Sequence, residues 1–383
     1  MEGRQGNAEV TQLWTIPASG GEGFPLTDAR TWVRSPSWSA DGRKLFYVSN
    51  RVGSKDLWQQ SLTEDGRPIG EPLAVTQGLG IQSATFSPDG GKLAYGRGQN
   101  VSNVWRVPIL SGRPATWADA EPVTSEHAYI EFVDVSPDGQ FLAISSDRSG
   151  NQDLWVLPAE GGEITPTDPT PDWAPQWSPD GKEIAFYAYR SGNRDIWVMP
   201  SQGGPARQLT SHPGLDDNPT WSPDGKEIAF SSIRNGDRRI WVIEAAGDQE
   251  PRRLTSGTGR ETQPVWSPTG DWLAFTINSN QLYRISREGG EPTLIPGGPE
   301  PTISLSPYFS PDGTSIYYSD AYGPQENRGL WKVALEDATL SRVTRLQGRR
   351  GKLGYVVATD GQFLYFLWRE DVGDIWVMDI VTE

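Results

Sequence analysis

The sequence predicts an all-β protein, a single eight-bladed β-propeller whose blades are four-stranded antiparallel sheets. Three observations support this. The hairpin motif Trp-Ser-Pro-Asp-Gly-Lys-Glu-Ile-Ala-Phe occurs at 177–186 and again at 221–230. Its turn glycine recurs along the chain at intervals of 42 to 49 residues, and an aliphatic–aromatic pair follows each hairpin. A period in the forties with four short strands is typical of propeller blades, whereas helical repeats would show a 3.6-residue apolar rhythm.

Each repeat is organised around a tight hairpin turn. Proline suits the second position of a type I turn, and glycine tolerates the left-handed conformation that follows. Three hairpins depart from the motif, at Ala40, at Thr269 and at Ala358-Thr359, but all keep their glycine. The turn glycines are Gly42, Gly90, Gly139, Gly181, Gly225, Gly270, Gly313 and Gly361.

The strands of a repeat follow from this turn. Strand a enters it, and strand b leaves it with apolar residues such as Ile228-Ala229-Phe230. Strand d is short and often ends in Leu-Thr, as at Leu209-Thr210. Strand c carries the aliphatic–aromatic pair, which we expect to form the core between neighbouring blades, because buried aromatic rings dominate core energetics. The pairs are Leu57-Trp58, Val104-Trp105, Leu154-Trp155, Ile196-Trp197, Ile240-Trp241, Leu282-Tyr283, Leu330-Trp331 and Ile375-Trp376.

The chain begins and ends inside a repeat. We count eight a–b hairpins, eight d strands and nine c strands, so we expect the N-terminal strand d to complete the last blade beside the C-terminal strand c and leave no free sheet edge. The surplus strand 10–16 then lies as a fifth, outer strand or frays. The expected blades of this one domain, 1–383, lie near 35–76, 81–124, 130–167, 173–210, 217–255, 262–296, 304–346, and 353–383 closed with 10–28.

The start in mid-repeat has two explanations. The chain is a piece of a longer polypeptide, with further domains outside the given sequence, or its first repeat is atypical, as terminal repeats often are.

Composition excludes several classes of function. The 383 residues carry a formal net charge of −15, which disfavours binding to nucleic acid or to anionic membranes. There are no cysteines, so disulfides, thiolate metal sites and cysteine nucleophiles are excluded. No apolar run approaches the length of a membrane helix, and we expect no membrane insertion.

The repeat resembles the TolB-like propeller family over essentially the whole chain. Pro175 to Phe186, Arg190 to Gly192 and Asp195 to Trp197 carry the resemblance most fully, and 219–241 nearly as well. It implies a propeller fold and a periplasmic or other extracytoplasmic location. It also implies one of three roles: an interaction module, a sensor region of a bacterial kinase or transcriptional regulator, or the gating domain of a prolyl-oligopeptidase-like or tricorn-like peptidase. TolB itself has six blades and an additional N-terminal domain, which the eight hairpins do not match.

Catalytic signatures are missing from the sequence. There is no Gly-x-Ser-x-Gly elbow, no Walker loop and no Gly-x-Gly-x-x-Gly motif. The two histidines, His127 and His212, stand alone in loops, and two histidines without cysteine make a transition-metal site improbable. Asp216-Asp217-Asn218 has oxygen ligands for Ca²⁺, but side chain–backbone capping explains it better. We therefore predict no enzyme, no metal and no cofactor.

The candidate binding residues lie where the d–a and b–c loops meet at one end of a propeller. Irregular loops on a regular scaffold usually carry specificity. Just before or at the start of strand a stand Arg34, Glu131, Trp173, Asp217 and Glu261, which we expect to rim the central channel. Trp173 falls outside the core pattern, and either ligand contact or packing against a neighbouring blade explains it.

An arginine also recurs after strand b, at Arg51, Arg97, Arg148, Arg190, Arg234 and Arg369. Six guanidinium groups could bind an anionic partner. We favour a structural role instead, in which they pair with the aspartates that precede strand c, namely Asp56, Asp153, Asp195 and Asp374.

The sequence thus favours a non-catalytic, monomeric binding module that holds a protein, a peptide or a small ligand on this loop face. The most concrete form is the sensor or interaction propeller of a bacterial multidomain or periplasmic protein. The alternatives are a gating propeller separated from its peptidase domain and a stand-alone propeller hydrolase or lyase.

Overall fold

A computed structural model describes residues 3–4, 11–27, 33–52, 54–149, 152–162, 165–168, 171–278, 281–296, 306–322 and 327–379, and their regular secondary structure is entirely β. The chain divides into two compact units. We call Val101–Glu370 the ring unit and Met1–Asn100 with Asp371–Glu383 the terminal unit. Among the described residues there is no helix that could span a membrane.

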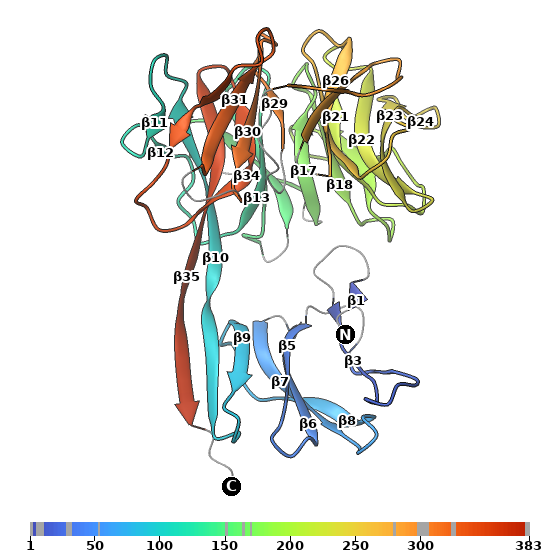
Figure 1. The fold of residues 1–383 in the computed structure, drawn as a ribbon, viewed down its shortest axis with the longest axis vertical. Coiled ribbons are helices and arrows are strands. Elements are labelled where there is room, and N and C mark those ends of the chain that lie inside the picture. Colours follow the sequence, from blue (N-terminus) through green and yellow to red (C-terminus); the bar gives the residue numbers. More distant parts are fainter. Residues whose placement is uncertain are drawn as a thin grey trace. The chain divides into compact units, whose positions relative to one another are not determined.

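Five sheets of the ring unit are each built from four consecutive antiparallel strands, so short local turns make most of the pairings (Figure 1). In order they are β13 (Ile130–Val135), β14 (Phe141–Ser146), β15 (Asp153–Pro158) and β16 (Thr165–Asp168); β17 (Asp172–Trp177), β18 (Glu183–Ala188), β19 (Asp195–Pro200) and β20 (Arg207–Gln208); β21 (Asp216–Trp221), β22 (Glu227–Arg234), β23 (Asp237–Glu244) and β24 (Arg252–Arg253); β25 (Glu261–Trp266), β26 (Trp272–Ile277), β27 (Gln281–Ser286) and β28 (Thr293–Leu294); β29 (Tyr308–Phe309), β30 (Ser315–Asp320), β31 (Gly329–Ala334) and β32 (Leu340–Arg342).

The sixth sheet joins strands from distant parts of the chain. Its order is β34 (Lys352–Thr359), β35 (Phe363–Asp379), β10 (Lys92–Pro108) and β12 (Glu121–Pro122). Nearby, β11 (Ala115–Thr116) pairs in parallel with β33 (Thr344–Arg345). The first strands of the six sheets, β13, β17, β21, β25, β29 and β34, contact one another in a closed cycle. The ring unit is therefore a closed ring of six sheets.

The hairpin turns interlock around this ring. In each turn, the residue at or beside the proline position packs against the turn glycine of the next sheet. The closeness of this contact is given by the distance to the point where a Cβ atom on that glycine would lie. The distances from that point are 3.9 Å for Pro137 at Gly181, 3.4 Å for Pro179 at Gly225, 3.3 Å for Pro223 at Gly270, 3.6 Å for Pro268 at Gly313, 3.2 Å for Pro311 at Gly361 and 3.2 Å for Asp360 at Gly139. The last contact joins the sixth sheet to the first.

The core lies between adjacent sheets, as the sequence predicted. The aliphatic members of the strand c pairs from Leu57 to Leu330 are buried, and most of their aromatic partners are partly buried at the same interfaces. The last pair differs, because Ile375 and Trp376 are exposed.

The terminal unit repeats the blade pattern on a smaller scale. One four-stranded sheet contains β5 (Val33–Trp38), β6 (Lys44–Val52), β7 (Ser54–Leu62) and β8 (Pro68–Ala74). A second has β9 (Ile81–Phe86) beside the first part of β10, which pairs in turn with the end of β35. The short pairs are β1 (Gly3–Arg4) with β2 (Thr11–Gln12), and β3 (Trp14–Thr15) with β4 (Phe24–Pro25).

The all-β fold and the four-stranded antiparallel sheets are confirmed, but the eight-bladed ring is not. Its predicted closure placed the N-terminal strand d, part of 10–28, beside the strand c of 353–383, whereas β4 pairs with β3. The expected surplus strand 10–16 corresponds to β2 and β3, and residues 10 and 28 lie outside the described part of the chain. The physical reason is that β10 and β35 run straight through their expected b–c loops and pair with each other.

A buried carboxylate links three sheets of the ring. Asp134 of β13 accepts hydrogen bonds from the backbone N–H of Trp177, at 2.8 Å, and from the Tyr308 hydroxyl, at 3.0 Å. Burial raises the pKa of Asp134 to about 6, above its ordinary value of 3.8.

Asp134 should therefore make stability fall as pH rises. Because the pKa of Asp134 is higher in the folded than in the unfolded chain, its protonated form stabilises the folded chain. This stabilisation is complete below about pH 4 and is lost as pH rises through about 6. Relative to Asp134→Asn, we expect the unfolding free energy of the parent to fall between pH 4 and 7, by at most about 1.4 kcal/mol per pH unit. Denaturant unfolding at several pH values measures this. Asp138→Asn should show the opposite trend, because its turn hydrogen bonds lower the pKa of Asp138. A flat difference for Asp134 contradicts the assignment.

The turn contact can be separated from backbone strain within one sheet. Gly225 and Gly236 both have positive φ, at 69° and 83°, but only Gly225 faces a neighbouring proline. Both alanine variants should lose about 1 kcal/mol from left-handed strain. Gly225→Ala should lose about 1 kcal/mol more, because the contact is already tight. Equal losses in urea unfolding would show that the proline contact carries no energy.

Candidate functional site

The strands nearest the ring axis share a bulge close to their first residues. Pairing shifts after Trp173 in β17, after Asp217 in β21 and after Thr262 in β25. In each case the next residue has a left-handed backbone, with φ of 51° at Ala174, 52° at Asn218 and 55° at Gln263. Bulges of this kind re-aim side chains, and such strain clusters at functional positions. We call this end of the ring unit the strand-start face.

Four aromatic residues form a continuous belt on this face. The rings of Trp173 and Tyr187 stack with centroids 5.7 Å apart and planes 9° apart. Phe132 meets Tyr187 edge-on at 6.4 Å and Tyr355 edge-on at 5.9 Å. The aromatic belt, Trp173, Tyr187, Phe132 and Tyr355, thus spans three neighbouring sheets, and all of its members except Tyr187 are partly exposed.

Arginines lie at both ends of the belt. The guanidinium of Arg194 is 4.8 Å from the Tyr187 ring centroid, and its Nε donates a 2.6 Å hydrogen bond to the Tyr189 hydroxyl. At the other end Arg369 lies 5.3 Å from the ring centroid of Tyr355. Burial raises the pKa of both belt tyrosines well above 10, so both are neutral phenols at ordinary pH. The belt therefore presents apolar rings between two cations.

Asp217 holds the arginines on one side of the belt. Its carboxylate oxygens accept hydrogen bonds from Arg194, at 2.5 Å, and from Arg238, at 2.6 Å. The Asn218 amide also donates to Asp217, at 3.0 Å. Because Asp217 and Arg238 are both buried, Asp217 fixes the position of Arg194 and presents no free carboxylate itself.

Glu261 begins β25 and is buried. It accepts a hydrogen bond from the Thr255 hydroxyl, and burial raises its pKa. The residues at its position in the two preceding sheets, Asp172 and Asp216, are also buried. This position lies inside the ring wall.

The recurring arginines pair differently from the prediction. Arg190 forms its ion pair with Asp172, while Asp195 accepts hydrogen bonds from Ser191 and Gln208. Several of these arginines also stack on the strand c tryptophan of their own sheet. The distances to the ring centroids are 4.9 Å for Arg51 on Trp58, 5.0 Å for Arg148 on Trp155, 5.5 Å for Arg190 on Trp197 and 4.0 Å for Arg234 on Trp241.

Four of the five predicted channel residues begin adjacent strands of the ring unit: Glu131, Trp173, Asp217 and Glu261. Arg34 occupies the matching position of β5 in the terminal unit, where Ser35 has the same left-handed backbone. Sequence reasoning missed Phe132, Tyr187, Tyr355 and Arg194. Phe132 could have been found, because it lies next to the predicted residue Glu131. The bulge that orients these rings, however, has no sequence signature.

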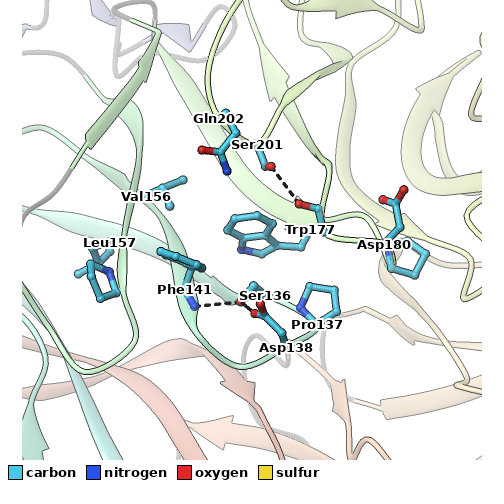
Figure 2. Close-up of a pocket in the computed structure, with 13 residues that line it drawn as sticks. Ser136, Pro137, Asp138, Phe141, Val156, Leu157, Trp177, Asp180, Ser201 and Gln202 are labelled. Carbon is cyan, nitrogen blue, oxygen red and sulfur yellow. Dashed lines mark hydrogen bonds between the residues drawn. The ribbon is translucent and has the colours of Figure 1, made fainter.

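A pocket of about 650 Å³ lies at the opposite, turn end, between the β13–β16 and β17–β20 sheets. Figure 2 shows the Trp177 ring near its centre, with Phe141 and Pro137 beside it. Its carboxylates serve their own turns: the Ser178 hydroxyl donates to Asp180 at 2.7 Å and is the first cause that lowers the pKa of Asp180 to about 2. The surface of this pocket is polar and apolar in nearly equal parts.

Two further features of the described residues concern metal ions and histidine. No group of three or more His, Asp or Glu residues there could hold a metal ion. His212 accepts a 2.8 Å hydrogen bond from the backbone N–H of Gly214, which gives it a local structural role.

Removing the Asp217 charge should destabilise the ring unit. Asp217→Asn leaves buried Arg238 without its counter-charge, so we expect a loss of about 3–5 kcal/mol in unfolding free energy. The control is Glu183→Gln, which removes one member of a pair whose two side chains are both more than a third exposed, Glu183 with Arg207, and should change stability by no more than about 0.5 kcal/mol. Denaturant unfolding compares the two, and similar small losses would show that Asp217 does not anchor the arginines.

Comparison with known proteins gives TolB proteins and a peptidase among the relatives. The chain is 31% identical over 128 residues to the Tol-Pal system protein TolB of Anaeromyxobacter dehalogenans, a match that covers 33% of this chain and 26% of that protein. It is 29% identical over 97 residues to the uncharacterized peptidase YuxL of Bacillus subtilis, covering 23% of this chain and 14% of YuxL. The chain therefore matches about a quarter or less of the length of these relatives.

Solved structures agree on the fold. A structure assigned as TolB from Agrobacterium tumefaciens matches with a TM-score of 0.58 at 22% identity, covering 72% of this chain and 100% of that chain. TolB from Acinetobacter baumannii matches with a TM-score of 0.50 at 20% identity, covering 90% and 81%. The family model for the TolB beta propeller domain matches residues 75–210 and 165–349. Together with the closed ring of sheets, this shows that the chain belongs to the TolB beta-propeller domain family.

Proposed function

We propose that this protein is a non-catalytic binding module whose strand-start face holds a protein segment or peptide. Its most concrete form is the interaction or sensor propeller of a bacterial multidomain or periplasmic TolB-like protein. The observation that carries the proposal is the aromatic belt, which presents three partly exposed rings between Arg194 and Arg369.

The chemistry of the belt suits a peptide. Rigid aromatic rings supply large contact area at small entropic cost, and interface hot spots are enriched in tryptophan, tyrosine and arginine. Apolar or proline side chains can pack on Trp173 and Phe132, while a carboxylate of the ligand can reach Arg194 or Arg369. A small acidic or aromatic ligand would use the same groups.

The predicted residues take different parts in this proposal. Trp173 and Glu131 contact the ligand directly, because both are partly exposed at the start of adjacent strands. Asp217 acts by positioning Arg194. For Arg34 and Glu261, ligand contact stays a prediction.

The family supports binding more than catalysis. The curated TolB relative is named as a component of the Tol-Pal system, which supports a protein partner here. The peptidase relative is matched over only 14% of its length, and this sequence has no nucleophile elbow, so a gating role is not favoured. That the chain forms a single eight-bladed domain and that it is a monomer are likewise proposals.

A peptide-display selection against the full chain tests the function. Peptides that bind the parent should bind Trp173→Ala and Phe132→Ala at least about ten-fold more weakly, the loss of about 1.4 kcal/mol expected for a hot-spot ring. The control is Phe141→Ala, which removes a more exposed ring from the turn-end pocket and should leave Kd unchanged.

Two outcomes contradict the proposal. Either the peptides lose affinity only with Phe141→Ala, which places binding at the turn end, or the chain cleaves them, which makes it an enzyme.

A further inference from the structure

Two strands of this protein are nearly three times as long as most strands b and c of the ring unit. β10 and β35 each have 17 residues, whereas most strands b and c of the ring unit have six. Each long strand contains both a strand b and a strand c of one repeat, with the loop between them drawn straight. In β10 the strand b part holds Tyr95 and the strand c part holds Trp105, and in β35 the corresponding residues are Phe366 and Trp376.

Their pairing exchanges partners between two repeats. In an ordinary blade, strand b pairs with the next strand c, as Phe186 of β18 does with Trp197 of β19. Here the strand c part of β10 instead pairs with the strand b part of β35: Ile109 donates its N–H to the Gln362 carbonyl at 2.9 Å, and Trp105 packs in one cluster with Phe366.

The other two halves pair in the terminal unit. Lys92 forms an ion pair with Asp379 at 2.5 Å. Near the middle of the strands, Gly98 and Gly373 lie in backbone contact, since a Cβ on Gly98 would be 2.5 Å from the Gly373 Cα. Each strand b therefore holds the strand c of the other repeat.

The observed pairing leaves the side chains of one strand c exposed to solvent. The sequence Asp-Ile-Trp-Val-Met occurs at 195–199 and again at 374–378. In the first copy Ile196 is 0% and Val198 1% exposed, whereas in the second Ile375 is 82% and Val377 63% exposed. The same side chains that form core in β19 face solvent on both sides of β35, and an exposed apolar strand is a pairing site.

We propose that the strand c segments 103–108 and 374–379 can exchange, so that each returns to the strand b of its own repeat. Residues 98–102 and 369–373 would then form five-residue hairpin loops, which are ordinary lengths for such connections. The uncovered segment 374–379 becomes an inner strand of a blade, and all eight repeats become complete hairpins. The exposed segment 374–379 would therefore pair with a strand of the same chain, the strand b of its own repeat.

The exchange would also act on the aromatic belt, a consequence that rests on the proposed function. Phe132 and Tyr355 meet because β13 and β34 are neighbours in the ring of six sheets. With the two repeats before β13 restored, other sheets separate β13 from β34, and the belt is divided. A peptide that spans the belt should therefore favour the six-sheet pairing.

Cysteine pairs can distinguish the two pairings, because the chain has no cysteine of its own. The four cysteine positions occupy equivalent places in the two repeats. Lys92 and Phe363 lie three residues before the strand b aromatic residue, which is Tyr95 or Phe366. Pro108 and Asp379 lie three residues after the strand c tryptophan, which is Trp105 or Trp376. Lys92→Cys with Asp379→Cys, and Pro108→Cys with Phe363→Cys, report the observed pairing. Lys92→Cys with Pro108→Cys, and Phe363→Cys with Asp379→Cys, report the exchanged pairing. Glu183→Cys with Pro200→Cys, at the same register of an ordinary hairpin, is the positive control.

The expected result is that both sets form disulfides within one chain during slow oxidation of the folded protein, identified by mass spectrometry of linked peptides. Three results overturn the proposal: only the observed pairs and the control link, only the exchanged pairs link, or the disulfides join two copies of the chain. No ligand is needed, so this test can succeed or fail independently of the peptide selection.

Hydrogen exchange of the unmodified chain gives a second measurement that does not depend on variant folding. Peptides covering 92–108 and 363–379 should show two mass populations, whereas the matched hairpin 183–200 shows one. A single population in all three segments would contradict slow exchange between two pairings.

Discussion

The pairing of β35 with β10 is the contact on which the ring depends. Five sheets close locally, through turns that the sequence encodes within each repeat. Only the sixth needs strands that are more than 250 residues apart, Val101–Pro108 of β10 and Phe363–Glu370 of β35. On the other side of this sheet, the hairpin of β34 and β35 meets the first sheet, where β34 contacts β13 and Asp360 packs against Gly139. Ring closure is therefore a single long-range event placed on top of local hairpins.

The candidate site depends on that closure in a direct way. The belt begins at Trp173, passes through Phe132 and ends at Tyr355, which lies on the sheet that closes the ring. Buried ionic contacts fix its cationic ends, above all the carboxylate of Asp217 between Arg194 and Arg238. A regular scaffold thus holds rigid rings and positioned guanidinium groups at one end.

The two ends of the ring carry different kinds of order. At the turn end, proline–glycine contacts join five pairs of neighbouring sheets and Asp360 at Gly139 joins the sixth, while the turn aspartates accept hydrogen bonds from serine hydroxyls. At the strand-start face, the residues in matching positions differ from sheet to sheet: Glu131, Trp173, Asp217 and Thr262. The turn end is therefore regular from sheet to sheet, whereas the strand-start face varies.

The sequence by itself determined the local structure: the hairpins, the buried strand c residues such as Ile196, and the set of strand starts to which Trp173 belongs. These follow from turn chemistry and apolar pattern within a few residues. Tertiary structure alone decided which hairpins share a ring, because Asp-Ile-Trp-Val-Met at 195–199 and 374–378 carries the same pattern and only the available partner strand differs. It also decided the belt, since Phe132, Tyr187 and Tyr355 meet only after three sheets have packed and the bulges have turned their side chains.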